Sequence, residues 1–211
     1  NFNQQPVCRS TLKVMTDVIA HRGPDGEGQY VDGFLGFGHR RLAIIDLSSA
    51  AHQPMQTHDK RYAITYNGEV YNFKELRGEL ESLGYQFYSQ SDTEVILNAF
   101  VEWKERCLTK FNGMFAFAIW DKKEKKLFIA RDRYGVKPLY FLHTNNSFIF
   151  GSEVKAILKS GKYTPSLDKE ALVEYLTFQN FFTDKTLFQD IKMLMPGYCA
   201  FISASGQFNE Q

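Results

Sequence analysis

The stretch MFAFAIWDKKEKKLFIARD, residues 114–132, carries the strongest fold signal in the sequence. Its first arm is apolar and rich in β-forming residues, a charged turn follows at 121–125, and a second apolar run returns. This pattern predicts a β-hairpin. Because the first arm is apolar at every position, it also predicts a strand that is covered on both faces. Two sheets packed on each other, with helices outside, would provide that cover.

Other parts of the chain also contain short apolar runs that end at polar turns. PLYFLHTNNSFIFGSE (138–153) predicts a second hairpin with its turn at Asn145-Asn146, and YCAFIS (198–203) predicts a further strand. Short apolar runs at 34–37, 42–45 and 63–66, and a segment from Tyr85 to Tyr88, are also predicted as strands. Strands outnumber helices, so we predict an α+β domain with a sheet-on-sheet core.

Helical spacing of apolar residues predicts four helices. One follows Ser10, one runs from Asn72 to Leu83, one follows Ser91-Asp92, and the last is capped by Asp168. Glu75, three residues after Asn72, fits a capping box at the start of the second helix.

Composition narrows the class of protein. The 211 residues, 44% hydrophobic, suffice for one substantial core or at most two small ones. A net charge of +1 implies no general attraction to nucleic acid or membrane. The apolar runs are shorter than the roughly 20 residues of a membrane span. Three cysteines without a CxxC pair favour a reducing, cytoplasmic location.

Several common site motifs are absent. There is no GxxxxGK[ST], GxGxxG, GxSxG or HExxH. The histidines show no metal-ligand spacing, so each is interpreted as a surface or hydrogen-bonding residue: His21, His39, His52, His58 and His143. A phosphate-binding or zinc enzyme is therefore disfavoured, and no metal is expected in this domain.

Six phrases, in order, carry a resemblance: HRGPDGEG (21–28), HRRLAIIDLS (39–48), YNGEVYNF (66–73), SDTEVI (91–96), NGMFAFAIWD (112–121) and ARDRYGVKPLYF (130–141). Together they resemble the glutaminase domain of the asparagine synthetase family, a class II glutamine amidotransferase, over nearly all of residues 1–211. The resemblance implies the N-terminal-nucleophile hydrolase fold, a four-layer αββα sandwich of two antiparallel sheets. It also implies hydrolysis of glutamine to glutamate and ammonia.

Asn67-Gly68 has two interpretations. By itself the pair is typical of a tight turn, here between a strand and a helix. The resemblance instead implies an oxyanion hole, in which the Asn67 amide and the Gly68 backbone N–H stabilise the tetrahedral intermediate. It also implies that Glu69 helps to hold the α-amino group of the substrate.

Arg41 is a candidate for binding a substrate carboxylate, because a guanidinium binds a carboxylate bidentately. The resemblance implies this role, with the pocket lined by the backbone of Leu42, Ala43, Ile44 and Ile45. Arg40 would point to the other side of the strand, toward solvent or a surface acid.

Asp92 could cap a helix, as Ser91 could equally, or could bind the ammonium of glutamine as the resemblance implies. We expect HRGPD to form a loop near the mouth of the pocket. Arg131, Asp132 and Lys137 are interpreted as a structural ion-pair network.

Members of the family begin, after removal of the initiator Met, with a cysteine whose thiol attacks the amide and whose α-amino group is the base. The sequence given begins with Asn1. We therefore expect a short N-terminal segment carrying this cysteine to precede residues 1–211, and a synthetase domain to follow them. Cys8 has no free amine, and Cys107 and Cys199 are expected to be ordinary thiols. Residues 1–211 alone are expected to lack glutaminase activity.

Glutamine and the C-terminal synthetase domain are the expected partners, a homodimer is left open, and nucleic acid and membrane are not expected. No SGGxDS loop is present, so ATP and Mg²⁺ should bind in the synthetase domain. Two alternatives stay open: a degenerate domain that binds glutamine or a partner without hydrolysis, and a glutaminase that serves a sugar or another acceptor.

Overall fold

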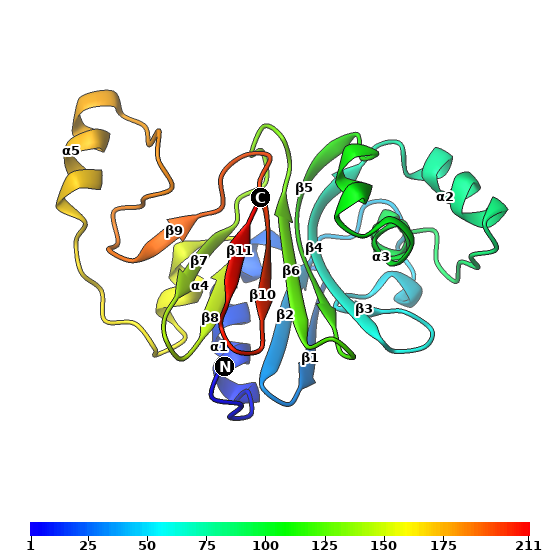
Figure 1. The fold of residues 1–211 in the computed structure, drawn as a ribbon, viewed down its shortest axis with the longest axis horizontal. Helices are drawn as coiled ribbons and strands as arrows, with labels where there is room; N and C mark the ends of the chain where they lie inside the picture. Colours follow the sequence, from blue (N-terminus) through cyan, green and yellow to red (C-terminus); the bar gives the residue numbers. More distant parts are fainter.

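A computed structural model describes all of residues 1–211, and its elements follow one another as drawn in Figure 1. The helices are α1 (Arg9–Asp17), α2 (Phe73–Ser82), α3 (Asp92–Trp103), α4 (Val154–Leu158) and α5 (Lys169–Phe178), with short 3-10 turns at Ala20–Arg22, Ser49–Ala51 and Lys104–Thr109. The strands are β1 (Gly26–Asp32), β2 (Leu35–Arg41), β3 (Met55–Gln56), β4 (Tyr62–Val70), β5 (Gly113–Asp121), β6 (Lys126–Arg131), β7 (Tyr140–His143), β8 (Phe148–Gly151), β9 (Ile191–Met193), β10 (Cys199–Ser203) and β11 (Phe208–Glu210).

The largest sheet has six antiparallel strands in the order β11-β10-β6-β5-β4-β3. Helices α2 and α3 cover one of its faces (Figure 1). A cluster of 20 buried residues fills the space between the sheet and these helices.

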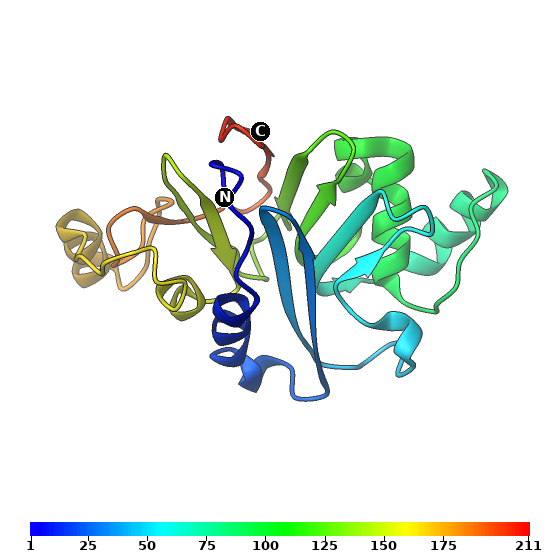
Figure 2. The same ribbon diagram turned by 90° about the horizontal axis from the view of Figure 1, so that it is seen from below.

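The other face of this sheet packs against a second β layer, formed by the pair β1-β2 and the sheet β8-β7-β9. A second cluster of 13 buried residues lies between the two layers. Helices α1 and α4 pack outside the second layer, against β2 and β8 (Figure 2). The fold is therefore a four-layer αββα sandwich, as the family resemblance implies.

Strand β5 is apolar at every position from Met114 to Trp120 because both of its faces are buried. Phe115, Phe117 and Ile119 point into the cluster under the helices, whereas Ala116, Ala118 and Trp120 point into the cluster between the sheets. Each large side chain buried in this way contributes about 1.5–3 kcal/mol. The charged turn and the returning strand β6 follow as predicted.

The second β layer is in two pieces, and an apolar groove separates them. The groove, about 390 Å³ in volume, is walled by β2 on one side and β8 on the other, with α1 outside and β4 and β5 beneath. Because β2 pairs only with β1 and β8 only with β7, each strand presents an unpaired edge to the groove.

Three local predictions are wrong. Residues 42–45 form a loop after β2 and no strand, because the N–H of Ala43 donates to the Asp25 carboxylate, 2.9 Å away, and not to a neighbouring strand. Residues 85–88 form no strand, because the backbone N–H of Tyr88 donates to the Glu94 carboxylate on α3, 3.0 Å away, and pairs with no neighbouring strand. The capping box is also absent: the Asn72 side chain donates to the carbonyl of Lys110 and accepts from the N–H of Asn112, so it joins the start of α2 to the loop before β5.

The predicted ion-pair network at Arg131 and Asp132 is wrong as well. The guanidinium of Arg131 donates to three backbone carbonyls, of Gly135, Lys137 and Leu194, at 2.6–2.7 Å. Burial is the main cause that lowers the pKa of Arg131 from its ordinary value. The Asp132 carboxylate likewise accepts from backbone N–H groups, so the two charged side chains bind the backbone instead of each other.

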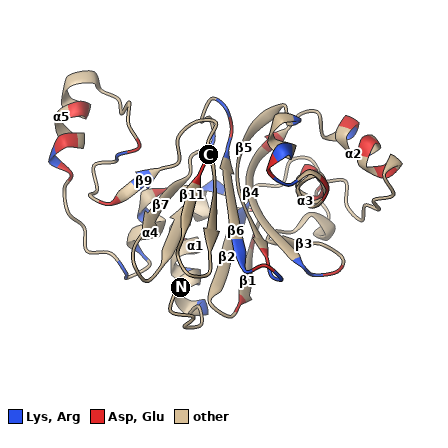
Figure 3. Cartoon of the chain, viewed as in Figure 1, with Lys and Arg blue, Asp and Glu red and all other residues tan.

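Charged residues of both signs are interspersed over the loops and helices in the view of Figure 3, in keeping with the net charge of +1. None of the helices has the length and apolar character that a bilayer crossing requires.

Candidate active site

The free edge of β4 supplies the first part of the site. Antiparallel pairing turns alternate N–H groups toward the same side of a strand. Tyr66 N donates to the side chain of Gln53 at 2.7 Å and Val70 N to Asp92 at 3.1 Å, so both point away from β5. The N–H of Gly68, midway between them, lies on the same edge. Asn67-Gly68 is thus part of a strand that continues to Val70, and its interpretation as a turn is wrong.

Gly68 cannot carry a side chain in this position. A Cβ atom there would lie 2.2 Å from the carbonyl oxygen of Met114 and 2.7 Å from the Cα of Phe115, both on β5. The backbone φ of +156° is also one that other residues rarely adopt. Glycine therefore allows β4 to pack closely on β5 while its N–H faces outward.

The side chain of Asn67 projects from the face of the large sheet that looks toward the second β layer, as do those of Ala63 and Thr65. The Nδ2 atom of Asn67 is buried and has no hydrogen-bond partner. Native proteins rarely leave such a donor unsatisfied, because the lost hydrogen bonds to water cost about 1–3 kcal/mol. An unpaired amide donor beside an outward-facing backbone N–H can bind an oxygen that carries negative charge.

A polar pocket of about 350 Å³ lies beside these two donors. Its lining includes every predicted substrate-binding residue: Arg41, Leu42, Ala43, Ile44, Ile45, Asn67, Gly68, Glu69 and Asp92. The structure thus brings residues from β2, the following loop, β4 and α3 into one cavity. The lining also includes Arg22, Arg40, Lys137 and Asp46, so basic and acidic residues surround one small volume, which suits a small zwitterion.

Arg41 lies at the end of β2, where its guanidinium donates to the carbonyl of Ser48 at 3.0 Å and to that of Asp46. These bonds fold the loop 42–48 around the pocket. Arg40, the preceding residue, points the other way and pairs with Asp17 and with Glu27, as predicted from strand alternation.

Asp92 is buried, and the helix cap is supplied by its neighbour. The Ser91 hydroxyl accepts from the N–H of Thr93 at 3.1 Å, so the capping interpretation belongs to Ser91. The Oδ2 of Asp92 accepts from the Tyr66 hydroxyl at 2.7 Å and from Val70 N. Burial raises the pKa of Asp92 above its ordinary value, although these hydrogen bonds oppose the shift.

The HRGPD loop reaches the pocket, as expected, through His21 and Arg22, and Lys137 reaches it from the loop 132–137. No three His, Cys, Asp or Glu side chains gather into a possible metal site.

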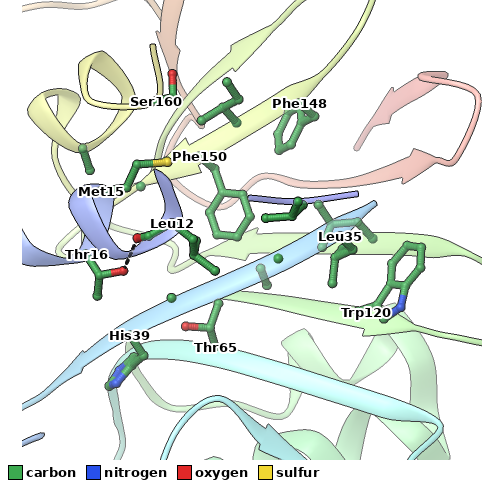
Figure 4. A pocket seen from close by; sticks show the side chains of 18 of the residues that line it. Leu12, Met15, Thr16, Leu35, His39, Thr65, Trp120, Phe148, Phe150 and Ser160 are labelled. Atoms are coloured by element: carbon green, nitrogen blue, oxygen red, sulfur yellow. Dashed lines mark hydrogen bonds between the residues drawn. The ribbon is translucent and has the colours of Figure 1, made fainter. Parts of the chain in front are cut away.

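The apolar groove meets the polar pocket at one place. Five residues line both cavities, and we call this place the junction: Arg22, His39, Arg40, Tyr66 and Asn67. Figure 4 shows the groove enclosed by Leu12, Leu35, Phe148 and Phe150, with His39 at the end near β4.

The cysteines do not form part of the junction. Cys107 and Cys199 are free and buried, and burial raises the pKa of each thiol. Cys8 is exposed, lies just before α1, and is 3.0 Å from the Ser10 hydroxyl, which lowers its pKa to about 6. It has no free amine, because it lies within the chain.

Two residues of the site were missed by sequence reasoning. Gln53 was not singled out, although its side chain accepts from Tyr66 N and donates to Thr93 at 3.3 Å. His39 was interpreted as an ordinary hydrogen-bonding histidine. The alternation of Leu35, Phe37 and His39 along β2 is a signal that could have placed it on the inner face.

Two solved structures share the fold of this chain. The glutamine phosphoribosylpyrophosphate amidotransferase of Bacillus subtilis has a TM-score of 0.69 to this chain at 19% identity, covering 95% of this chain and 46% of that one. An allosteric regulatory enzyme of purine biosynthesis has a TM-score of 0.61 at 20% identity, covering 86% of this chain and 35% of that one. The chain has the N-terminal-nucleophile hydrolase fold, as these two structures do.

The family model described as "Glutamine amidotransferase domain" matches residues 1–211, and the chain belongs to this family. Two relatives, the asparagine synthetases [glutamine-hydrolyzing] 1 and 3 of Bacillus subtilis (strain 168), are each 42% identical, over 93% and 98% of this chain. A putative asparagine synthetase [glutamine-hydrolyzing] 2 of Methanocaldococcus jannaschii is 40% identical over 80% of the chain. The chain spans about a third of the length of these relatives: 32%, 34% and 36%.

Proposed function

We propose that this domain hydrolyses the side-chain amide of glutamine to give glutamate and ammonia. The observation that carries the proposal is the buried, unpaired Nδ2 of Asn67 at the junction, next to the outward-facing N–H of Gly68. Two fixed donors at one point suit the oxygen of a tetrahedral intermediate, which is negatively charged.

The polar pocket would hold the amino-acid end of glutamine. The guanidinium of Arg41 binds the α-carboxylate, together with backbone groups of residues 42–45. Asp92 binds the α-ammonium, because its known hydrogen bonds use only Oδ2 and leave Oδ1 for the ligand. Glu69 lines the same pocket and adds negative charge toward that ammonium.

The nucleophile would be the N-terminal cysteine of a strand that precedes Asn1 and fills the apolar groove. The amino group of Asn1 lies 2.9 Å from the carbonyl of Phe34, next to the start of β2. A strand that continues from there antiparallel to β2 reaches the level of His39 and the junction after about six residues, at about 3.3 Å per residue. It would pair with the free edges of β2 and β8 and join the two pieces of the second layer.

The chemistry at the junction would then proceed in balanced steps. The α-amino group of that cysteine takes the thiol proton, and the thiolate forms a bond to the amide carbon, placing negative charge on the oxygen beside Asn67 and Gly68. The intermediate collapses as the C–N bond breaks, and the ammonium proton goes to the leaving nitrogen, which departs as ammonia. Water then cleaves the thioester to give glutamate and the free thiol.

The test is to restore the segment that precedes Asn1, once with its N-terminal cysteine exposed and once with serine in that place. We expect ammonia release with cysteine and a loss of about a thousandfold or more with serine, since serine is a weaker nucleophile at neutral pH. The 211-residue chain alone should show none. No release by the cysteine form, with glutamine binding retained, would favour a degenerate binding domain.

We further infer that the whole protein is a glutamine-dependent, ATP-using amide synthetase of the asparagine synthetase type. The support is the identity of 40–42% to relatives about three times as long. ATP and Mg²⁺ would bind in the part of the protein outside residues 1–211, which would receive the ammonia. A cytoplasmic location stays a prediction, supported by three cysteines that are all free.

The surface of α5 suits contact with that further domain. Val173, Leu176, Phe178 and Phe182 are exposed at or just after this helix, which projects from the body in Figure 1. An apolar patch of this kind marks an interaction site. Amide hydrogen exchange over residues 167–182 should be slower in the full-length protein than in the domain, and equal exchange in both would contradict this contact.

A further inference from the structure

Two buried side-chain atoms in the entire chain lack a hydrogen-bond partner, Nδ1 of His39 and Nδ2 of Asn67. Both residues lie at the junction, where the apolar groove meets the polar pocket. His39 reaches it from β2 in one β layer, and Asn67 from β4 in the other. Buried polar atoms are nearly always paired, so two orphans at one place indicate a ligand that pairs with both.

The hydrogen bonds of His39 fix which of its nitrogens carries the proton. Its Nε2 lies 3.0 Å from the backbone carbonyl of Tyr66, and a carbonyl oxygen can only accept. Nε2 is therefore protonated, and in the neutral ring Nδ1 is an acceptor. Burial lowers the pKa of His39 to about 4, so the ring is neutral at physiological pH. The junction thus presents one fixed acceptor, His39 Nδ1, and one fixed donor, Asn67 Nδ2.

This donor–acceptor pair matches a primary carboxamide, which offers a carbonyl oxygen to a donor and an NH₂ group to an acceptor. We propose, building on the function proposed above, that His39 determines specificity for glutamine over glutamate by accepting a hydrogen bond from the carboxamide NH₂ of the substrate. A carboxylate in the same place has no hydrogen to donate, and its charged oxygen would face the lone pair of Nδ1. The product glutamate would therefore bind weakly and leave the site.

An ordinary structural histidine would explain the bond to Tyr66 but not the orphan acceptor. A histidine held for packing has its second nitrogen paired or in water, whereas Nδ1 here is enclosed and unpaired although the residue as a whole is half-buried. The two nitrogens can be tested separately. Glutamine in place of histidine places its amide near the position of Nε2, and asparagine places its amide near that of Nδ1.

The experiment compares His39→Gln with His39→Asn in the protein that carries its native N-terminus. For each, the KM for glutamine and the inhibition constant of glutamate are measured. His39→Gln can keep the bond to Tyr66 but loses the acceptor, so we expect its KM for glutamine to rise about ten- to hundredfold. The discrimination ratio, which is the inhibition constant of glutamate divided by the KM for glutamine, should fall at least tenfold. His39→Asn keeps an amide oxygen near Nδ1 and should retain most of the discrimination. His58→Ala, at an exposed histidine outside both cavities, is the matched control.

Three results would overturn the proposal. The first is an unchanged discrimination ratio in His39→Gln. The second is a loss of discrimination in His39→Asn and not in His39→Gln, because a purely structural role would depend on the bond to Tyr66, which only glutamine can keep. A fall in kcat with an unchanged ratio would place His39 against the nucleophile instead of the substrate. The wild-type protein separates this inference from the proposed function, because absence of glutamine hydrolysis there would refute the function itself.

Discussion

The hydroxyl of Tyr66, on β4, donates a hydrogen bond of 2.7 Å to Oδ2 of Asp92, at the start of α3. The bond joins the strand that carries the two proposed oxyanion donors, Asn67 and Gly68, to the carboxylate that we assign to the substrate ammonium. Both residues are buried, and burial raises the pKa of both side chains. Keeping Asp92 ionised in this place therefore costs folding free energy, and a ligand cation would offset that cost.

Asp92→Asn should separate binding from stability. An amide oxygen can still accept from Tyr66 and Val70, but it cannot neutralise an ammonium, so we expect the KM for glutamine to rise at least about tenfold. Because the pKa of Asp92 is raised on folding, the folded state holds its proton more tightly than the unfolded state, and the ionised group reduces stability at neutral pH. The variant should keep its Tm or gain about 2–4 °C. Calorimetry and steady-state kinetics on the same sample measure both effects.

The same shift predicts a pH dependence. Glutamine affinity should fall as the pH decreases through the pKa of Asp92. Because burial raises this pKa, the fall should begin at a higher pH than for an ordinary aspartate. The Asp92→Asn variant should lack this limb of the profile. A large loss of Tm with unchanged KM would show instead that Asp92 has only a structural role.

Asn67→Ala should reduce kcat by about 10²–10³ and raise KM by much less, since the donor matters most when negative charge develops on the substrate oxygen. The measurement is the steady-state rate of glutamate release over a range of glutamine concentrations. If KM rises and kcat holds, Asn67 contributes to binding only.

Arg41→Ala should raise the KM for glutamine about ten- to hundredfold, because a charge-assisted pair with the α-carboxylate is lost. Arg41→Lys should recover only part of this loss, since lysine cannot hold the Asp46 and Ser48 carbonyls and a carboxylate in one plane. Arg61→Ala, at a residue just before β4 and outside the polar pocket, is the control. An unchanged KM in Arg41→Ala would contradict the assignment.

Asp132→Ala tests the loop 132–137. The Asp132 carboxylate accepts from the backbone N–H groups of Phe115, Tyr134, Val136 and Lys137 at 3.0–3.2 Å. Leaving such donors unpaired should cost about 3 kcal/mol or more, which corresponds to a Tm lower by about 6–12 °C. Asp17→Ala, which removes an exposed acid, should change Tm by about 2 °C at most. Equal Tm values for the two variants would refute this account of Asp132.

The sequence predicted the layers because that information is local and redundant. Continuous apolarity from Met114 to Trp120 requires cover on both faces, and the turn residues at 121–125 and Asn145-Asn146 mark the two hairpins. The role of Asn72 depends on two partners distant in sequence, Lys110 and Asn112. The absence of a strand at 85–88 depends on a side-chain contact with Glu94 of the next helix. Periodicity reveals neither.

The candidate site was predictable in part, for a related reason. The resemblance named the residues that line the polar pocket, and the structure brings all of them together. His39 was not recognised, because its importance lies in an atom without a partner, and this can be seen only where two β layers meet.

The most direct test of the central claim is covalent labelling of the nucleophile. A reactive diazoketone analogue of glutamine is incubated with the protein that carries its native N-terminus, and the adduct is located by peptide mass. We predict one adduct, on the N-terminal cysteine of the strand preceding Asn1, suppressed by excess glutamine and strongly slowed by Arg41→Ala. An adduct on Cys8, or labelling that glutamine does not suppress, would contradict the account.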